Sequence, residues 1–199
     1  MTTDTLYLEG EEEFGPVTSF LFRVGSLLLN KYYSTIIVDL KEKKFNNLLD
    51  IGCGNGTLIG KLANSFQSSH FYGIDPSPYM LGNAKRKMSR MGLTSRTELK
   101  LGSSRSVPFD FKFDAIVSSF SYHHWKERDN SLVSLASHLN DGGFISIYEF
   151  NNTSRRHHSS HGIDEKEWAQ IEIEGLSKSI IQKNGLIILT LKKLNFSSI

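Results

Sequence analysis

The chain has 199 residues and a formal net charge of +2, with 39% hydrophobic and 22% charged residues. This size and composition fit one folded domain and exclude an intrinsically disordered chain. The charge alone does not indicate nucleic acid, because such a partner also needs clustered Lys and Arg, and no aromatic-plus-basic stripe stands out. The single cysteine, Cys53, excludes an internal disulfide and any multi-cysteine metal site.

The start of the chain predicts an acidic arm over 1–15, without the basic and apolar segments of a signal peptide. Apolar stretches such as 17–30 are interrupted by polar residues and are too short to span a bilayer. We therefore expect a cytoplasmic protein with no membrane span. Apolar residues then recur at spacings of three and four, which predicts one or two amphipathic helices as an N-terminal extension over 16–42.

The next hundred residues alternate between short apolar runs and helical patterns. The expected strands lie at 47–51, 70–75, 97–101, 113–120 and 142–150, and the expected helices at 57–66, 78–91 and 131–139. Apolar strands separated by helices predict an α/β fold with a Rossmann-like, doubly wound, mostly parallel sheet of six or seven strands and helices on both faces. We treat 1–199 as one domain, with 46–150 as its ligand-binding core and 151–199 as its substrate-side part.

The C-terminal part is expected to contain a loop, a helix and a strand. The stretch 153–162 is polar, basic and His-rich, which is typical of a loop. Asp164 and Glu167 form a capping-box pattern, so a helix is expected from there to about Lys183. Residues 185–196 supply one more strand.

A glycine-rich segment, Asp50-Ile51-Gly52-Cys53-Gly54-Asn55-Gly56, joins the first expected strand to the next helix. In parallel α/β sheets ligands bind at the carboxyl ends of strands, and glycines let the backbone approach them closely. Asp75 ends the second strand, where a carboxylate can accept hydrogen bonds from both ribose hydroxyls of a nucleoside. A dinucleotide fingerprint would need a glycine in place of Thr57 or Ile59, so a dehydrogenase is disfavoured.

The segment LLDIGCGNGTL (48–58) resembles the first motif of the class I S-adenosylmethionine-dependent methyltransferases. GIDPSPYML (73–81), FDAIVSSFSYHHW (113–125) and LNDGGFISIYEF (139–150) are similar to later regions of that family, especially its small-molecule, ubiquinone/menaquinone-biosynthesis-like branch, methyltransferase type 11. The resemblance covers 47–150. It implies S-adenosylmethionine as cofactor, S-adenosylhomocysteine as product and methyl transfer by in-line displacement.

The resemblance also implies residue roles, with Asp75 as the ribose ligand and Met80 as an adenine contact. It departs at the third motif, where Ser103 and Ser104 replace the usual acidic adenine contact. The family fold ends in an antiparallel strand pair, but only eight residues follow Leu191, so we expect the last strand to be short or missing. The expected cofactor contacts are Asp50, Gly52, Cys53, Gly54, Gly56, Asp75, Pro76, Met80, Ser103, Ser104, Ser118 and Ser119.

Candidate catalytic residues follow the fourth and fifth strands, at the ligand-binding edge. His123 and His124 are candidate general bases, because His can accept a proton near neutral pH; the alternative is that they only pack against cofactor and substrate. Tyr122, Glu149 and Arg155 are candidates for the substrate side. The HHxxH run at 157–161 lies in an expected loop and therefore lacks the helical i, i+4 geometry of a zinc site, so no metal is expected.

The methyl acceptor is expected to be a small molecule. The segment SSFS (118–121) lacks the Asn/Asp-Pro-Pro-Tyr-like tetrapeptide of methylases that act on exocyclic amines, and no cysteine outside the glycine loop could serve C5 base methylation. Two alternatives stay open: a tRNA or rRNA methyltransferase acting with a partner, and a catalytically silent cofactor-binding subunit of a methyltransferase complex. We expect a monomer or homodimer without a nucleic-acid partner.

Overall fold

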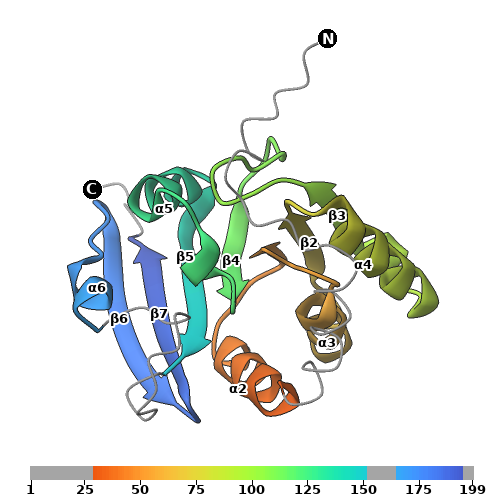
Figure 1. Cartoon of the computed structure of the whole chain (residues 1–199), viewed down its shortest axis with the longest axis horizontal. Helices are drawn as coiled ribbons and strands as arrows, with labels where there is room; N and C mark the ends of the chain where they lie inside the picture. Colours follow the sequence, from red (N-terminus) through yellow and green to blue (C-terminus); the bar gives the residue numbers. More distant parts are fainter. Residues whose placement is uncertain (1–28, 152–164, 195–199) are drawn as a thin grey trace.

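The computed structural model describes residues 29–151 and 165–194. The expected acidic arm, the first part of the N-terminal extension and the His-rich loop at 153–162 lie outside the described residues. Seven strands form one sheet in the order β3-β2-β1-β4-β5-β7-β6 (Figure 1). Their bounds are β1 Asn47–Ile51, β2 His70–Asp75, β3 Thr97–Leu101, β4 Phe113–Ser119, β5 Leu139–Phe150, β6 Leu176–Lys183 and β7 Leu186–Lys193.

The sheet is parallel from β3 to β5, and β7 lies antiparallel between β5 and β6. From β1 the chain adds β2 and β3 on one side of the sheet and then adds β4 and β5 on the other side. The strand order therefore reverses between the neighbouring strands β1 and β4. Ligands of open α/β sheets bind at the carboxyl ends of the strands at such a point. The topology therefore places the candidate site above the ends of β1 and β4.

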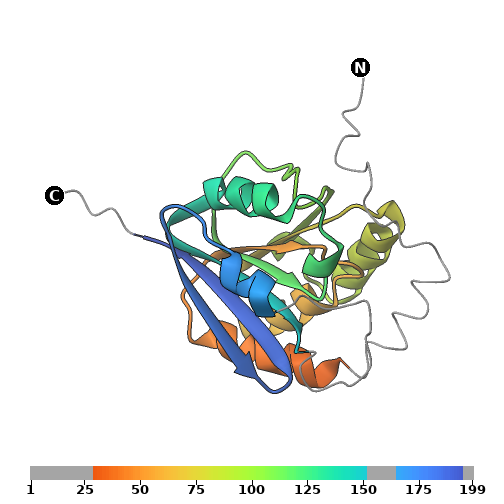
Figure 2. The ribbon, with the colours of Figure 1, turned by 60° about the vertical axis from the view of Figure 1, so that its left-hand side comes forward.

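Helices cover both faces of the sheet, as Figures 1 and 2 show. One core cluster joins the sheet to α2 (Asn30–Lys41), α3 (Thr57–Ser65) and α4 (Pro78–Arg90). A second cluster joins the opposite face to α5 (Arg128–Ser137) and α6 (Glu165–Gln170). Short 3₁₀ turns lie at Thr94–Arg96 and Tyr122–His124. The expected Rossmann-like, doubly wound α/β fold is confirmed.

On the face covered by α5, the loop between β3 and β4 contains no helix, and aromatic side chains cover the sheet there instead. The ring of Tyr72 on β2 lies with its centre 5.3 Å from that of Phe109, 5.1 Å from that of Phe111 and 5.4 Å from that of Phe113. These edge-to-face contacts shield β2 where a crossover helix would otherwise pack. Ser103 and Ser104 lie at the start of this loop, directly after the end of β3.

The helix predicted up to Lys183 is wrong beyond Gln170. Residues 176–183 form strand β6, which pairs antiparallel with β7. Lys183 pairs with Leu186, and the two residues between them, Asn184 and Gly185, have φ angles of 52° and 84°. This is the two-residue hairpin turn that an Asn-Gly dipeptide favours.

The expectation of a short or missing last strand is therefore also wrong, because β6 and β7 each have eight residues. Other boundaries move as well: α5 begins at Arg128 rather than at 131, β5 begins at Leu139 rather than at 142, and β7 ends at Lys193 rather than at 196. Within the described ranges, no helix is both long and apolar enough to cross a membrane.

Candidate active site

The glycine loop leaves β1 in a conformation that other residues adopt only with strain. Gly52, Gly54 and Gly56 have φ angles of 71°, 53° and 72°. The backbone N–H groups of Gly52 and Cys53 both donate to the carbonyl oxygen of Ile74 at 2.9 Å, which ties the loop to β2. A Cβ on Gly52 would lie 2.5 Å from Oγ of Ser121, whereas a Cβ on Gly54 would meet no heavy atom within 4 Å. Open space therefore adjoins the loop at Gly54.

The carboxylate of Asp75 links this loop to α4. Its Oδ2 accepts a hydrogen bond from the backbone N–H of Gly54 at 2.8 Å, and its Oδ1 accepts one from Ser77 at 2.9 Å. Ser77 is the N-cap of α4 and its hydroxyl accepts from the N–H of Met80 at 3.3 Å, so Asp75 is not the cap. Each Asp75 oxygen keeps a further lone pair. Burial raises the pKa of this carboxyl to about 6.

A cleft of about 880 Å³, counting space open to solvent, lies over the ends of β1, β2 and β4. Nine of the residues expected at the site line it: Gly52, Cys53, Gly54, Asp75, Pro76, Ser103, Ser104, Ser119 and His124. The cleft is also lined by residues that were not expected to bind, namely Tyr33, Ile51, Asn55, Thr57, Leu58, Phe120, Ser121 and Trp125. The remaining candidates among the described residues lie outside this lining: Asp50, Gly56, Met80, Ser118, Tyr122, His123 and Glu149.

Asp50 lies beneath the glycine loop as a buried carboxylate, 1% exposed. Within the described part of the chain its Oδ1 has no hydrogen-bond partner. Burial raises the pKa of Asp50 well above its usual range, and the nearby Asp75 raises it further. Among the described residues that line the cleft there is no Lys or Arg. The charges around the cleft thus favour a cationic ligand.

The segment after β4 forms the opposite wall. The hydroxyl of Ser121 donates to the carbonyl oxygen of Ile51 at 2.9 Å and lies 2.8 Å from that of Ser118, which joins the ends of β1 and β4. Phe120 has a φ of 57°, a strained value for a residue with a side chain. Its ring stacks on that of Phe150 with centres 4.6 Å apart and meets the ring of Tyr33 edge-on at 5.8 Å.

The two histidines occupy different positions. Nδ1 of His123 lies 3.0 Å from Oε2 of the buried Glu149, and its backbone N–H donates to Oε1 of the same carboxylate at 3.3 Å. His124 lines the cleft, and its ring centre lies 3.9 Å from that of His123. Tyr122 is buried and borders a second hollow beside α5 and α6. Arg155 lies outside the described residues.

Residues 49–145 match the model of a methyltransferase domain family. An uncharacterized methyltransferase of Bacillus cytotoxicus is 32% identical over 117 residues, which cover 57% of this chain and 51% of that protein. Over about half of its length the chain is thus similar to S-adenosylmethionine-dependent methyltransferases. It spans about half the length of the curated relatives that it matches.

Solved methyltransferase structures share this fold. A SAM-dependent methyltransferase from Aquifex aeolicus superposes with a TM-score of 0.76 at 18% identity, covering 92% of this chain and all of that one. The plantazolicin methyltransferase BamL, in complex with a triazolic desmethylPZN analog and SAH, superposes with a TM-score of 0.74 at 17% identity, covering 89% and 91% of the two chains.

The residues at and beneath the cleft include groups that fit S-adenosylmethionine. The cofactor carries an ammonium and a sulfonium, and two carboxylates, Asp50 and Asp75, lie at the loop with one oxygen still without a partner in the described structure. Its ribose requires hydrogen-bond acceptors, which Asp75 retains. The described residues contain no cluster of three or more His, Cys, Asp or Glu side chains that could hold a metal ion.

Proposed function

We propose that this protein transfers the methyl group of S-adenosylmethionine to a small-molecule acceptor. One observation carries the proposal: a single cleft is lined both by the glycine loop with Asp75 and by His124 and Trp125. Cofactor and acceptor would therefore share one cavity above the ends of β1 and β4. The plantazolicin methyltransferase BamL, which shares this fold, forms a complex with both SAH and a triazolic desmethylPZN analog.

The loop end of the cleft would hold the cofactor. Asp75 accepts hydrogen bonds from the ribose hydroxyls, and the backbone at Gly54 offers close approach because no side chain occupies the space beside it. Asp50 supplies negative charge for the amino group. Ser103, Ser104, Pro76 and Met80 would contact the adenine. Gly56, Ser118 and Ser119 would shape the loop and the facing wall. When bound, the sulfonium supplies an already activated methyl group.

The protein's main contribution to the reaction would then be alignment and exclusion of water. Phe120 and Trp125 form apolar walls at the far end of the cleft, and Tyr33 closes it from α2. His124 is the residue placed to accept a proton from the acceptor, since it lines the cleft. His123, fixed by Glu149, would hold the ring of His124 in place. Tyr122 and Arg155 remain proposed for the substrate side.

Calorimetric titration with S-adenosylmethionine, S-adenosylhomocysteine and NADH tests the cofactor assignment. We expect the first two to bind and NADH not to bind. Absence of binding by all three would remove the proposed function.

Turnover is tested separately, by formation of S-adenosylhomocysteine with a panel of small-molecule acceptors. Replacing His124 by Gln should leave cofactor affinity unchanged and lower the turnover by about 10²-fold or more. Replacing the exposed His70 by Gln is the matched control. Equal turnover in the two variants would remove His124 from the proposal.

A further inference from the structure

Among the described residues, the segment that contains α3 and α4 carries mostly positive charge. Between Ile51 and Thr97 the sequence contains six Lys or Arg residues and one acidic residue, Asp75, which is buried at the cleft. Arg96 donates hydrogen bonds to three backbone carbonyls at the end of α3 and just beyond it, so its guanidinium is already engaged. The other five form what we call the basic face: Lys61, Lys85, Arg86, Lys87 and Arg90. None of the five belongs to an ion pair within the described residues.

An aromatic residue lies in line with the two arginines of this face. Tyr79, Asn83, Arg86 and Arg90 are spaced four, three and four residues apart, which places them along one side of α4. The buried residues of the helix, among them Ala84 and Met88, lie on the other side. The ring-bearing side chain of Tyr79 is 44% exposed, and Arg86 donates to Oδ1 of Asn83 at 2.7 Å.

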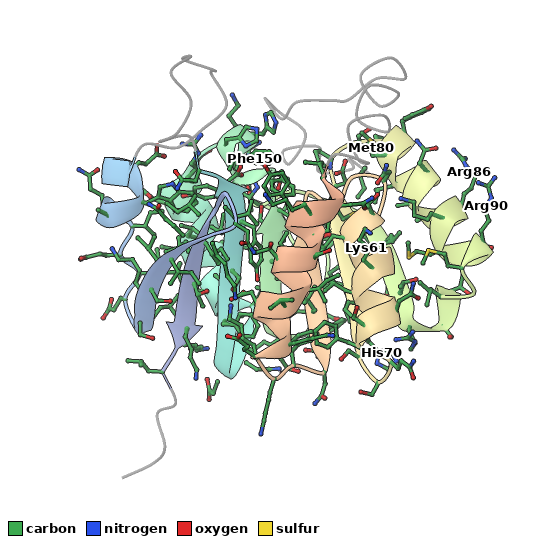
Figure 3. The ribbon with its side chains drawn as sticks, turned by 90° about the horizontal axis from the view of Figure 1, so that it is seen from below. Lys61, His70, Met80, Arg86, Arg90 and Phe150 are labelled. Atoms are coloured by element: carbon green, nitrogen blue, oxygen red, sulfur yellow. The ribbon has the colours of Figure 1, made fainter. Side chains whose placement is uncertain are left out.

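Figure 3 shows Arg86 and Arg90 pointing away from the body of the molecule along α4, with Lys61 on the neighbouring α3. With 13 residues α4 is about 20 Å long, so the stripe can contact several units of a polymer. The sequence shows four of the five charges together, within 85–90, whereas Lys61 precedes strand β2 and joins them only when α3 and α4 pack side by side.

Lys87 lies in a position where an added anion would be favourable. Its ammonium donates to Oγ1 of Thr57 at 2.7 Å and to Oδ1 of Asn55 at 3.4 Å, both of which are neutral acceptors. Burial and the charge of Lys61 lower the pKa of Lys87. Thr57 and Asn55 line the cleft, so the basic face extends to the cleft's edge.

We infer that the basic face binds the backbone of a single-stranded nucleic acid, with Arg86 and Arg90 contacting phosphates and Tyr79 stacking on a base. Guanidinium groups match phosphate geometry, and an exposed ring among cations is the combination that binds single strands without sequence preference. A lipid surface fits less well, because the apolar side of α4 is packed in the core and leaves little to insert into a membrane. The surface lies outside the cleft, so this inference does not depend on the identity of the acceptor.

Fluorescence anisotropy of the full chain with a short, labelled single-stranded RNA of mixed sequence tests the inference. We expect binding that weakens steeply as salt rises from about 50 to 200 mM, since each phosphate contact to a single strand contributes about −0.7 to the slope of log K against log salt. The double variant R86Q/R90Q should bind at least about tenfold more weakly, with a slope shallower by about 1.4. Tyr79→Ala should weaken binding by about fivefold or more while leaving the slope unchanged.

The matched control is K112Q/K192Q, which removes two exposed positive charges away from α3 and α4. It should bind RNA within about twofold of the unmodified protein, allowing for weak long-range electrostatics. All variants should retain S-adenosylmethionine affinity and the thermal midpoint of unfolding, which separates this test from that of the proposed function.

Three results would overturn the inference. The first is equal loss of RNA binding in the control and the arginine variant. The second is a higher affinity for phosphatidylserine vesicles than for RNA, or a higher affinity for poly-glutamate at matched charge, measured as displacement of RNA. The third is RNA binding only after removal of residues 1–14, which would assign the basic face to the chain's own acidic segment. Methylation of the bound RNA would support the docking surface and move the acceptor to RNA.

Discussion

At the scale of single residues, the carboxylate of Asp75 is bound on two sides before any ligand arrives. It accepts from Gly54 and from Ser77, and therefore orders the glycine loop as well as offering acceptors to the cleft. Replacing Asp75 by Asn should weaken S-adenosylmethionine binding by about 1–3 kcal/mol, because the new amide group presents donors where two N–H groups and the ribose need acceptors. Calorimetry measures the change, and the exposed Asp110→Asn serves as control. Unchanged affinity would remove the ribose assignment.

The raised pKa of Asp75 makes cofactor binding depend on pH. Its pKa of about 6 in the folded protein lies above its ordinary value of 3.8, so its contribution to stability is fully present below 3.8 and is lost as pH rises through 6. A cofactor that requires the carboxylate should bind about tenfold more weakly at pH 5 than at pH 7.5, since about a tenth of the groups are ionised at pH 5. Calorimetry across this range measures the effect, and D75N should abolish it. A dependence that persists in D75N would assign the titration to another group.

Two glycines of one loop should respond differently to the same substitution. Gly52→Ala should lower the free energy of unfolding by more than the 1–2 kcal/mol of a left-handed alanine, because its methyl would also meet the Ser121 side chain at 2.5–2.8 Å. Gly54→Ala should lower the free energy of unfolding only by the cost of the left-handed backbone conformation. It should also weaken cofactor binding, since its methyl enters the open cleft. Urea unfolding and calorimetry separate the two effects. The reverse ranking in urea would contradict the contact with Ser121.

Some site residues could be predicted from the sequence because they lie within one strand–loop–helix unit. The glycine loop and Asp75 follow two consecutive strands, so local pattern alone places them at the same edge. Tyr33 and Ser121 enter the cleft from α2 and from the segment after β4, and their positions depend on packing that no local pattern records. Ser121 is found only through its hydrogen bond to the carbonyl of Ile51.

At the scale of elements, β6 shows where pattern reasoning fails. Within the described part of the chain it is an edge strand that pairs only with β7, and most of its residues, including Ile180 and Ile181, are exposed. Such a strand needs no alternation of apolar and polar residues, so its sequence does not distinguish the period of a strand from that of a helix. The informative signal was the Asn184-Gly185 dipeptide before β7, which predicts a hairpin and so excludes a helix running to Lys183. By contrast, β1, β2, β4 and β5 are central and buried, and their apolar runs were sufficient.

The hairpin turn provides a test at this scale. Gly185 has a φ of 84°, so Gly185→Ala should lower the free energy of unfolding by about 1–2 kcal/mol. The control is Gly82→Ala within α4, where a methyl would meet only Nη1 of Arg86 at 3.8 Å and helix propensity predicts a gain of up to about 1 kcal/mol. Urea unfolding should therefore move the two midpoints in opposite directions. A shift in the same direction would contradict the turn geometry.

At the scale of the whole molecule, the cleft is built on the centre of the sheet rather than on a peripheral loop. The strand that carries the glycine loop, β1, is hydrogen-bonded to β2 and to β4, and both helical layers pack against these strands. A ligand held by this loop should therefore stabilise the domain as one unit and not only the loop. This expectation follows from topology, which the alternation of strands and helices in the sequence predicts well.

Cofactor binding should consequently raise the thermal midpoint of unfolding by an amount that all probes report equally. A ligand at a hundred times its Kd adds about 2.7 kcal/mol, which for a domain of this size corresponds to roughly 5–10 °C. The two tryptophans, Trp125 at the cleft and Trp168 on α6, report the core on the α5 side, while far-ultraviolet circular dichroism reports the entire sheet. The midpoints that both signals report should rise equally when S-adenosylhomocysteine is added, and neither should rise with NADH. A shift in fluorescence alone would mean that the ligand orders the cleft without stabilising the sheet, which would contradict the coupling through β1.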